Sequence, residues 1–238
     1  MPHGKNSRVN VGGYSLTNYL KSYSLEKSIG TVDQTVFALN SKAYIQGLKD
    51  AVATMEGVFQ DSDDAGVDNI VDALEDSENN ITIYPYLTSQ GRPGYGFRSY
   101  NTAYNPNSSI DDSVKFSYGA QGNDGAERLI SITNGDEDID DNEATTTYDF
   151  GSDPSHTEGI AYLNISAFSG TSIDAVLQTD SDAGFASPTT LATFDSITGI
   201  CSQRKTFTGK DVERYVRILF SNVSGETCTV QCGVKFYS

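Results

Sequence analysis

The stretch LTNYLKSYSLEKSIGTVDQTVFALNSKAYIQGLKDAVATMEGVF, residues 16–59, decides the fold expected of this chain. Apolar and polar side chains alternate at both of its ends, which predicts two half-buried strands, Leu16–Lys27 and Ala51–Gln60. The connection Ser28–Asp50 is too long for a simple hairpin, because such loops usually take about 2–5 residues. It is also too apolar to remain in water. We therefore expect an arm that a neighbouring subunit covers.

The apolar residues of this arm form the candidate inter-subunit interface. Large aromatic side chains near the centre of an interface usually contribute most of its binding energy. Phe37 and Tyr44 are the aromatic residues of the arm and should therefore be its strongest contacts. The alternative is that both pack into the sandwich of their own subunit. The candidate interface residues are Val32, Val36, Phe37, Tyr44, Ile45 and Leu48.

Four short motifs in the same stretch resemble a known family. They are LTNYL at 16–20, VDQTVF at 32–37, SKAYIQGLKD at 41–50 and MEGVF at 55–59. Together they are similar to the major tail tube protein of long-tailed (siphovirus-type) bacteriophages, over about residues 10–120. The resemblance implies a β-sandwich with a flanking helix, in subunits that form hexameric rings. Stacked rings would make the hollow tail through which viral DNA is ejected.

Composition and charge narrow the function classes. The 238 residues are enough for one or two domains, and the formal charge is −16 with a pI near 4.3. Such a surface repels a phosphate backbone, which argues against sequence-specific DNA binding but suits a conduit for DNA. The alternative is that the charge only keeps the protein soluble or reflects a saline habitat.

Targeting and membrane signals are not expected either. No apolar run approaches the length of a membrane-spanning helix, and the first residues lack the apolar core of a secretory signal. We therefore expect no membrane partner.

An acidic segment predicts the domain boundary. Asn134–Glu143 holds six acidic residues in ten, which is typical of a solvated linker. The expected organisation is a tail tube domain at 1–134, with the arm at 28–50, an acidic linker at 135–144 and a second domain at 145–238. Within the first domain, residues 1–13 should be a loose arm and Asp68–Ser77 a short helix capped by Asp68.

The second half is dense in strand signals at about ten-residue spacing, which is typical of a sandwich. Its RYVRI run at 214–218 and the turn Thr179–Ala183 resemble appended β-sandwich modules of virion proteins, of jelly-roll or immunoglobulin-like type. The whole chain is thus predicted to be mostly β with one short helix. The expected strands are Ile160–Phe168, Ile173–Gln178, Leu191–Phe194, Arg204–Thr208, Glu213–Phe220 and Thr227–Tyr237.

Candidate chemistry is sparse. Cys228 and Cys232 lie about 13 Å apart along one strand, too far for a disulfide, so free buried thiols are expected; a bridge from Cys201 stays open. Asp136, Asp138 and Asp140 imitate the start of an EF-hand loop, whose sixth position requires Gly and whose twelfth requires Glu, and both are absent here. No metal site is expected.

Catalysis and cofactor binding are not expected. Neither His3 nor His156 stands in a nucleophile motif, and the Gly-rich stretch Gly91–Gly96 lacks the ending of a phosphate loop. We expect no catalytic residues, no cofactor and no enzyme activity.

These observations lead to one expected function and one alternative. The chain should be a structural virion protein that assembles with itself, contacts other tail proteins at the tube ends and lets viral DNA pass without specific binding. It should be assembled in the host cytoplasm and reside in the virion tail. The alternative is a carbohydrate- or receptor-binding sandwich of a virion surface protein.

Overall fold

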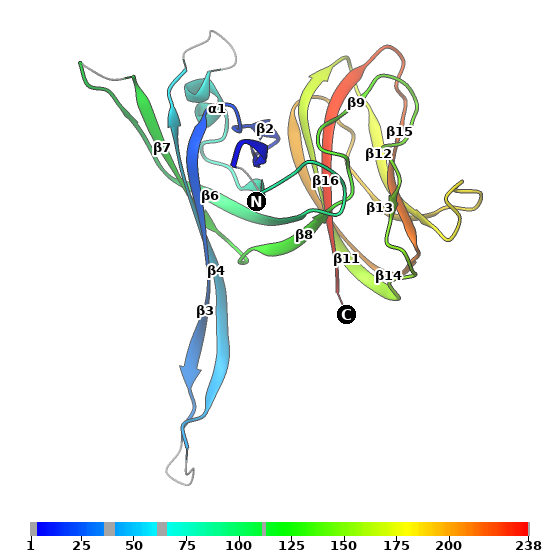
Figure 1. The fold of residues 1–238 in the computed structure, drawn as a ribbon, viewed down its shortest axis with the longest axis horizontal. Coiled ribbons are helices and arrows are strands. Elements are labelled where there is room, and N and C mark those ends of the chain that lie inside the picture. The colour runs from blue at the N-terminus through cyan, green and yellow to red at the C-terminus, as the bar shows by residue number, and fades with distance from the viewer. Residues whose placement is uncertain (1–3, 36–40, 61–65, 111–112, 238) are drawn as a thin grey trace. The chain divides into compact units, whose positions relative to one another are not determined.

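The computed structural model describes residues 4–35, 41–60, 66–110 and 113–237 (Figure 1). The described chain is mostly β, as predicted, and folds as two compact units. Unit 1 comprises Met1–Asn18, Asn80–Gly96 and Glu127–Ser238, and unit 2 comprises Tyr19–Asn79 and Phe97–Ala126. The described elements are η1 (Gly4–Asn6), β1 (Arg8–Val11), β2 (Tyr14–Ser15), β3 (Leu20–Asp33), β4 (Tyr44–Val58), α1 (Val67–Ala73), β5 (Asn79–Tyr84), β6 (Pro93–Asn107), β7 (Lys115–Gly122), β8 (Glu127–Ser131), β9 (Glu137–Ile139), β10 (Tyr148–Asp149), β11 (His156–Ser169), β12 (Asp174–Asp180), β13 (Thr189–Thr193), β14 (Cys201–Val212), β15 (Tyr215–Ser221) and β16 (Thr227–Tyr237).

Unit 1 is a sandwich of two antiparallel sheets. One sheet runs in the order β14-β11-β16-β8 and continues through the start of β6 to β5, β1 and β2; the other runs β10-β15-β12-β13. Apolar side chains from the inner faces of both sheets form one buried core, as alternation in the sequence predicts. Each Val, Leu, Ile or Phe side chain in this core stabilises the fold by about 1.5–3 kcal/mol when fully buried. The six strands predicted for the second half are all present as β11–β16.

The acidic segment is part of this sandwich and not a linker. Within it, β9 pairs with β16 and Ile139 is buried in the core. Asp138 accepts a hydrogen bond from the Thr229 hydroxyl at 2.7 Å. Asp136, Asp138 and Asp140 remain exposed while the backbone of β9 pairs with β16, so high acidity does not prevent strand pairing here. Unit 1 accordingly begins well before the boundary predicted at 135–144.

Residues 4–13 likewise form regular structure, where a loose arm was predicted at 1–13. In β1, Val9 and Val11 are buried, and the strand pairs with β5 through Val9–Ile83 and Val11–Ile81. Two apolar residues are too few to predict a strand from local sequence. They are enough to anchor β1 when β5 provides the backbone hydrogen bonds of the pair.

Unit 2 is an open antiparallel sheet in the order β3-β4-β7 and the remainder of β6, with α1. One face is buried: Ala53 of β4 pairs with Ala120 of β7, and Met55 pairs with Tyr118. The helix is shorter than predicted and begins after Gly66, with no side-chain cap. The carbonyl of Leu74, just after the helix, accepts a hydrogen bond from Asn101 Nδ2 at 3.1 Å.

Candidate self-assembly surface

The arm predicted between two separate strands is instead the outer part of one long hairpin. β3 continues to Asp33 and β4 begins at Tyr44, with paired residues from Leu20–Gly57 out to Asp33–Tyr44. Figure 1 shows the pair extending beyond the other strands of unit 2. From Lys27 to Asp33 the extension is about 20 Å at the usual strand rise. Strand pairing continues through the region that was predicted to be a loop because of its length.

Burial divides the hairpin into two parts. In β4 the residues from Ala51 to Gly57 alternate between buried and exposed, as expected where one face is covered. From Glu26 to Asp33 in β3 every residue is exposed, and no residue of β4 from Tyr44 to Asp50 is buried. We call residues 28–33 and 44–50 the outer hairpin. Neither of its faces is covered within the subunit.

The outer hairpin nevertheless carries large apolar side chains. Their exposed fractions are 54% for Ile29, 51% for Val32, 54% for Tyr44, 45% for Ile45 and 89% for Leu48. Val32 lies opposite Ile45, so these two share one face, while Tyr44 lies opposite Asp33 on the other. An isolated two-stranded hairpin is marginally stable in water. Both faces of the outer hairpin are open to solvent in this chain.

A bulge separates the two halves of the outer hairpin. The register shifts between Ile29 and Thr31, so Gly30 faces both Gly47 and Leu48. A Cβ on Gly47 would lie 3.0 Å from the Gly30 carbonyl oxygen, which makes glycine the residue that fits this close approach. The bulge leaves Leu48 as the most exposed of the apolar side chains named above.

Polar contacts hold the end of the hairpin. The Asp33 carboxylate accepts hydrogen bonds from the backbone and hydroxyl of Thr35, and the Thr35 hydroxyl accepts one from Ala43 N at 3.0 Å. The Thr35 hydrogen bonds lower the pKa of Asp33 below its usual value. Gln34 N also donates to the Ala43 carbonyl at 2.8 Å.

Of the predicted interface residues, the structure brings Val32, Tyr44, Ile45 and Leu48 together on the outer hairpin. Val36 and Phe37 lie outside the described residues. Ile29 was missed by the sequence reasoning, although it follows Leu25 and Lys27 at the strand period of two and could have been found that way.

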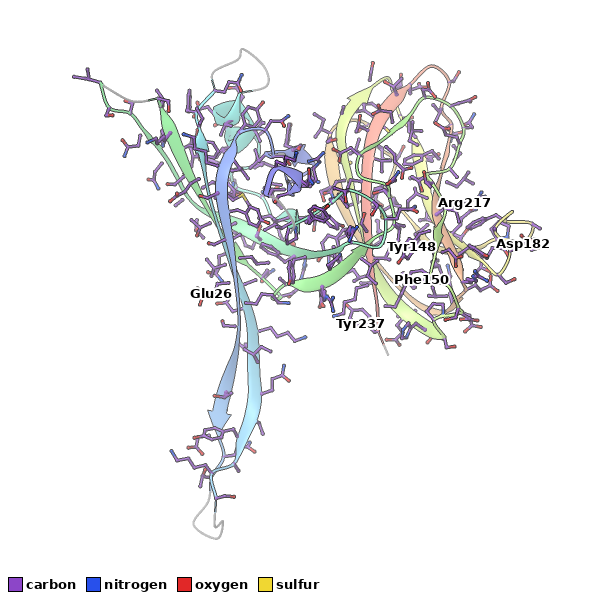
Figure 2. All side chains as sticks on the ribbon, viewed as in Figure 1. Glu26, Tyr148, Phe150, Asp182, Arg217 and Tyr237 are labelled. Carbon is purple, nitrogen blue, oxygen red and sulfur yellow. The ribbon has the colours of Figure 1, made fainter. Side chains whose placement is uncertain are left out.

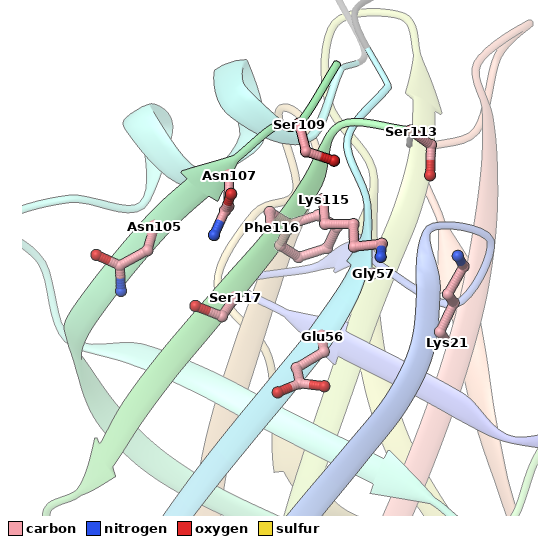
Figure 3. A pocket seen from close by; sticks show the side chains of 10 residues that line it. All are labelled: Lys21, Glu56, Gly57, Asn105, Asn107, Ser109, Ser113, Lys115, Phe116 and Ser117. Atoms are coloured by element: carbon pink, nitrogen blue, oxygen red, sulfur yellow. The ribbon is translucent and has the colours of Figure 1, made fainter. Parts of the chain in front are cut away.

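A polar hollow of about 530 Å³ lies toward the other end of the same strands. Figure 3 shows Lys21 of β3, Glu56 of β4 and Lys115 of β7 around it, with amides and hydroxyls from β6, β7 and their connection. Glu56 accepts a hydrogen bond from the Ser22 hydroxyl at 3.4 Å. With both signs of charge, the hollow can accept a polar group.

The described residues contain no group of three or more His, Cys, Asp or Glu side chains placed to hold a metal ion. Cys201, Cys228 and Cys232 are free thiols, as predicted for the latter two, and burial raises the pKa of each. No helix in the described part of the chain has the length and hydropathy needed to span a bilayer.

Comparisons with known proteins give likenesses in structure only. No family model and no curated protein matches the chain. A chain from the virion of a native gene transfer agent (GTA) particle aligns at 13% identity and a TM-score of 0.43, covering 54% of this chain and 98% of that one. A chain from the tail of an empty GTA particle with C6 symmetry aligns at 13% identity and a TM-score of 0.43. The alignment covers 53% of this chain and 98% of that one.

A third likeness spans nearly the whole chain. The SPP1 Dit protein, described as a paradigm of the hub adsorption apparatus in phages infecting Gram-positive bacteria, aligns at 11% identity with a TM-score of 0.37. The alignment covers 98% of this chain and 99% of that one.

Proposed function

We propose that this chain is a structural protein of a bacteriophage tail that associates with copies of itself through the outer hairpin. The observation that carries the proposal is a paired, regular hairpin whose apolar side chains are uncovered on both faces. Monomeric proteins rarely display a large contiguous apolar surface without a binding role. We infer that the partner of the outer hairpin is a second copy of this chain, because the motifs that resemble tail tube proteins run through the same hairpin.

The finer form of the proposal follows the sequence resemblance. Subunits form hexameric rings, and stacked rings make the tail tube of a siphovirus-type virion, assembled in the host cytoplasm. The open sheet of unit 2 supports ring closure, since an unpaired sheet edge is stabilised by pairing with a neighbour. The acidic chain supports a conduit that DNA crosses without adhering, and other tail proteins would contact the tube ends. The protein acts by assembly and not by catalysis.

Electron microscopy combined with sedimentation tests this proposal on the purified full chain. We expect rings or tubes at micromolar protein, and dissociation to subunits of about 25.7 kDa on dilution. A homogeneous monomer at every concentration, with no rings in the micrographs, would contradict it. A salt-sensitive retardation of duplex DNA would contradict the conduit, because electrostatic binding is strongest at low salt.

A further inference from the structure

A groove of about 440 Å³ in unit 1 has no part in the proposed assembly surface. It lies where aromatic side chains from both sheets of the sandwich meet. β8, β11 and β16 supply side chains from one sheet, and the residue after β10 supplies one from the other; Figure 2 labels Phe150 there. Its principal lining residues are Arg128, Ile130, Phe150, His156, Lys235 and Phe236.

The groove exists because the inner face of the sandwich continues beyond its core. Val234 of β16 is a core residue and pairs with Ile130 of β8. Phe236 lies two residues beyond Val234 on β16, and Arg128 lies two residues before Ile130 on β8. Both are on the same face as that pair, and both are accessible. Opposite Phe236, β11 has Gly159, where a Cβ would lie 2.5 Å from Phe207 Cζ and 2.9 Å from Phe236 Cδ1. Glycine thus leaves room for the two rings.

The aromatic wall is preformed. The Phe150 and Phe236 ring centroids are 5.3 Å apart, and the His156 ring stacks on Phe236 at 6.1 Å with an interplanar angle of 25°. Phe150 is fixed by its backbone N–H, which donates to the Arg214 carbonyl at 3.0 Å. The preceding Asp149 makes a bidentate ion pair with Arg214 at 2.7 and 2.8 Å. A site fixed in this way loses little conformational entropy on binding.

The charge of the groove is opposite to that of the chain. Every ionisable residue lining it is basic, namely Arg128, His156 and Lys235, although acidic residues outnumber Lys and Arg by 32 to 16 overall. Lys235 is held by an ion pair with Glu127. Among the residues that the structure describes, none forms an ion pair with Arg128. Its guanidinium is available, and a carboxylate fits its planar donors in bidentate geometry.

We propose that this groove binds an acidic sugar, with the sugar carboxylate on Arg128 and the sugar ring against Phe150 and Phe236. Small ligands occupy hollows of this size, in which apolar walls combine with a few polar groups. An extended acidic peptide fits less well. β8 pairs with β16 and β6, and β16 pairs with β11, so the strands beneath the groove offer no free edge for an added strand. This binding role is separate from the proposed self-assembly.

Calorimetric titration of the full chain tests the site, with digalacturonate as the probe and neutral digalactose as its uncharged counterpart. Digalacturonate should bind at least about tenfold more tightly than digalactose, the amount that one charged hydrogen-bonded contact contributes. Arg128→Gln should remove that advantage, and Phe150→Leu should weaken both sugars by removing the ring face. Arg128→Gln should leave the melting temperature unchanged because Arg128 is exposed. Phe150→Leu should lower it by a few degrees, because the ring's contact with Phe236 is lost while an apolar side chain remains.

Arg92→Gln is the matched control. Arg92 is exposed, its guanidinium lies 5.2 Å from the centroid of the Tyr86 ring, and it does not line the groove. The substitution therefore removes the same charge from the same unit without changing the groove. It should leave digalacturonate affinity unchanged. Absence of digalacturonate binding, an equal loss in Arg128→Gln and Arg92→Gln, or tighter binding of triglutamate than of digalacturonate would overturn the proposal. Each of these outcomes is distinguishable from a failure of ring assembly.

Discussion

The sandwich of unit 1 and the outer hairpin of unit 2 are built from the same antiparallel strands but differ in what covers them. In the sandwich, Val216 and Ile218 alternate with outward residues and lie in a core closed by the opposite sheet. In the outer hairpin, Val32 and Ile45 pair with equal regularity and remain exposed. Strand pairing alone therefore does not show where a fold is complete. The outer hairpin is the part of the described fold that no second layer covers.

The largest expected effect comes from removing that incomplete region. Replacing residues 29–49 by Asn-Gly would join Ser28 and Asp50, which already pair, through a tight turn that suits such strands. Assembly should be lost almost completely, because interfaces of this kind bury about 800 Å² per partner. The shortened subunit should still fold, since the described residues among those deleted are not buried. Light scattering and thermal melts measure the two effects, and unchanged rings would contradict the proposal.

A matched pair of leucines sharpens the comparison. Leu163 is buried in the sandwich and Leu48 is exposed on the hairpin. Leu163→Ala should lower the free energy of unfolding by about 2–5 kcal/mol through lost burial and a cavity. Leu48→Ala should change it by no more than about 0.5 kcal/mol while weakening association. Urea denaturation of the dissociated subunit gives both values; equal losses would mean that Leu48 packs within its own subunit.

The aromatic residues should have the next largest effect on association. Tyr44→Ala should weaken it by about 2 kcal/mol or more, as expected of an aromatic residue near the centre of an interface. We expect the same of Phe37→Ala. The melting temperature of the dissociated subunit should barely change.

Ile200→Ala, an exposed apolar position in unit 1 outside the outer hairpin, is the control and should alter neither property. A large loss in melting temperature with ring affinity intact would instead show that the two aromatic residues pack into their own subunit. Sedimentation equilibrium and calorimetry on the same samples separate the two outcomes.

The smallest expected effect is a pH dependence at the end of the hairpin. The pKa of Asp33 is lowered from its usual 3.8 in the folded chain by the Thr35 hydrogen bonds. A lowered pKa contributes stability above 3.8 that is lost as the pH falls through the folded value. The Ala43 and Thr35 amide resonances should therefore shift only at pH below this value. Thr35→Val should move the Asp33 titration upward; an unchanged titration in nuclear magnetic resonance would contradict the assignment.

Local alternation accounts for what the sequence predicted well. The strand Thr227–Tyr237 has the predicted bounds because Cys228, Val230, Cys232 and Val234 all face one core. β1 and β9 were missed because their partners lie far away in the chain: Asn10 pairs with Thr82, and Glu137 pairs with Val230. A short strand with few apolar residues depends on such partners, and no local pattern reveals them.

The sequence identified apolar residues of the candidate surface but did not predict that they lie on a paired hairpin. Val32, Tyr44, Ile45 and Leu48 were identified from apolar character alone, which does not depend on the backbone conformation. The hairpin was not recognised because its apolar side chains lie on both faces. Alternation between a buried and an exposed face, the usual strand signal, is therefore absent. That same absence is what distinguishes the hairpin from the strands of the sandwich.

Thiol labelling at position 48 tests the central claim most directly. In a Cys201→Ser background, Leu48→Cys places a thiol at the most exposed apolar position of the hairpin, while Cys228 and Cys232 stay buried. We expect rapid labelling by a maleimide in the dissociated subunit and strong protection after assembly. Ser181→Cys, on an exposed turn of unit 1, reports how much protection assembly gives elsewhere. Labelling of Leu48→Cys at the same rate before and after assembly would contradict the claim that the outer hairpin is the inter-subunit surface.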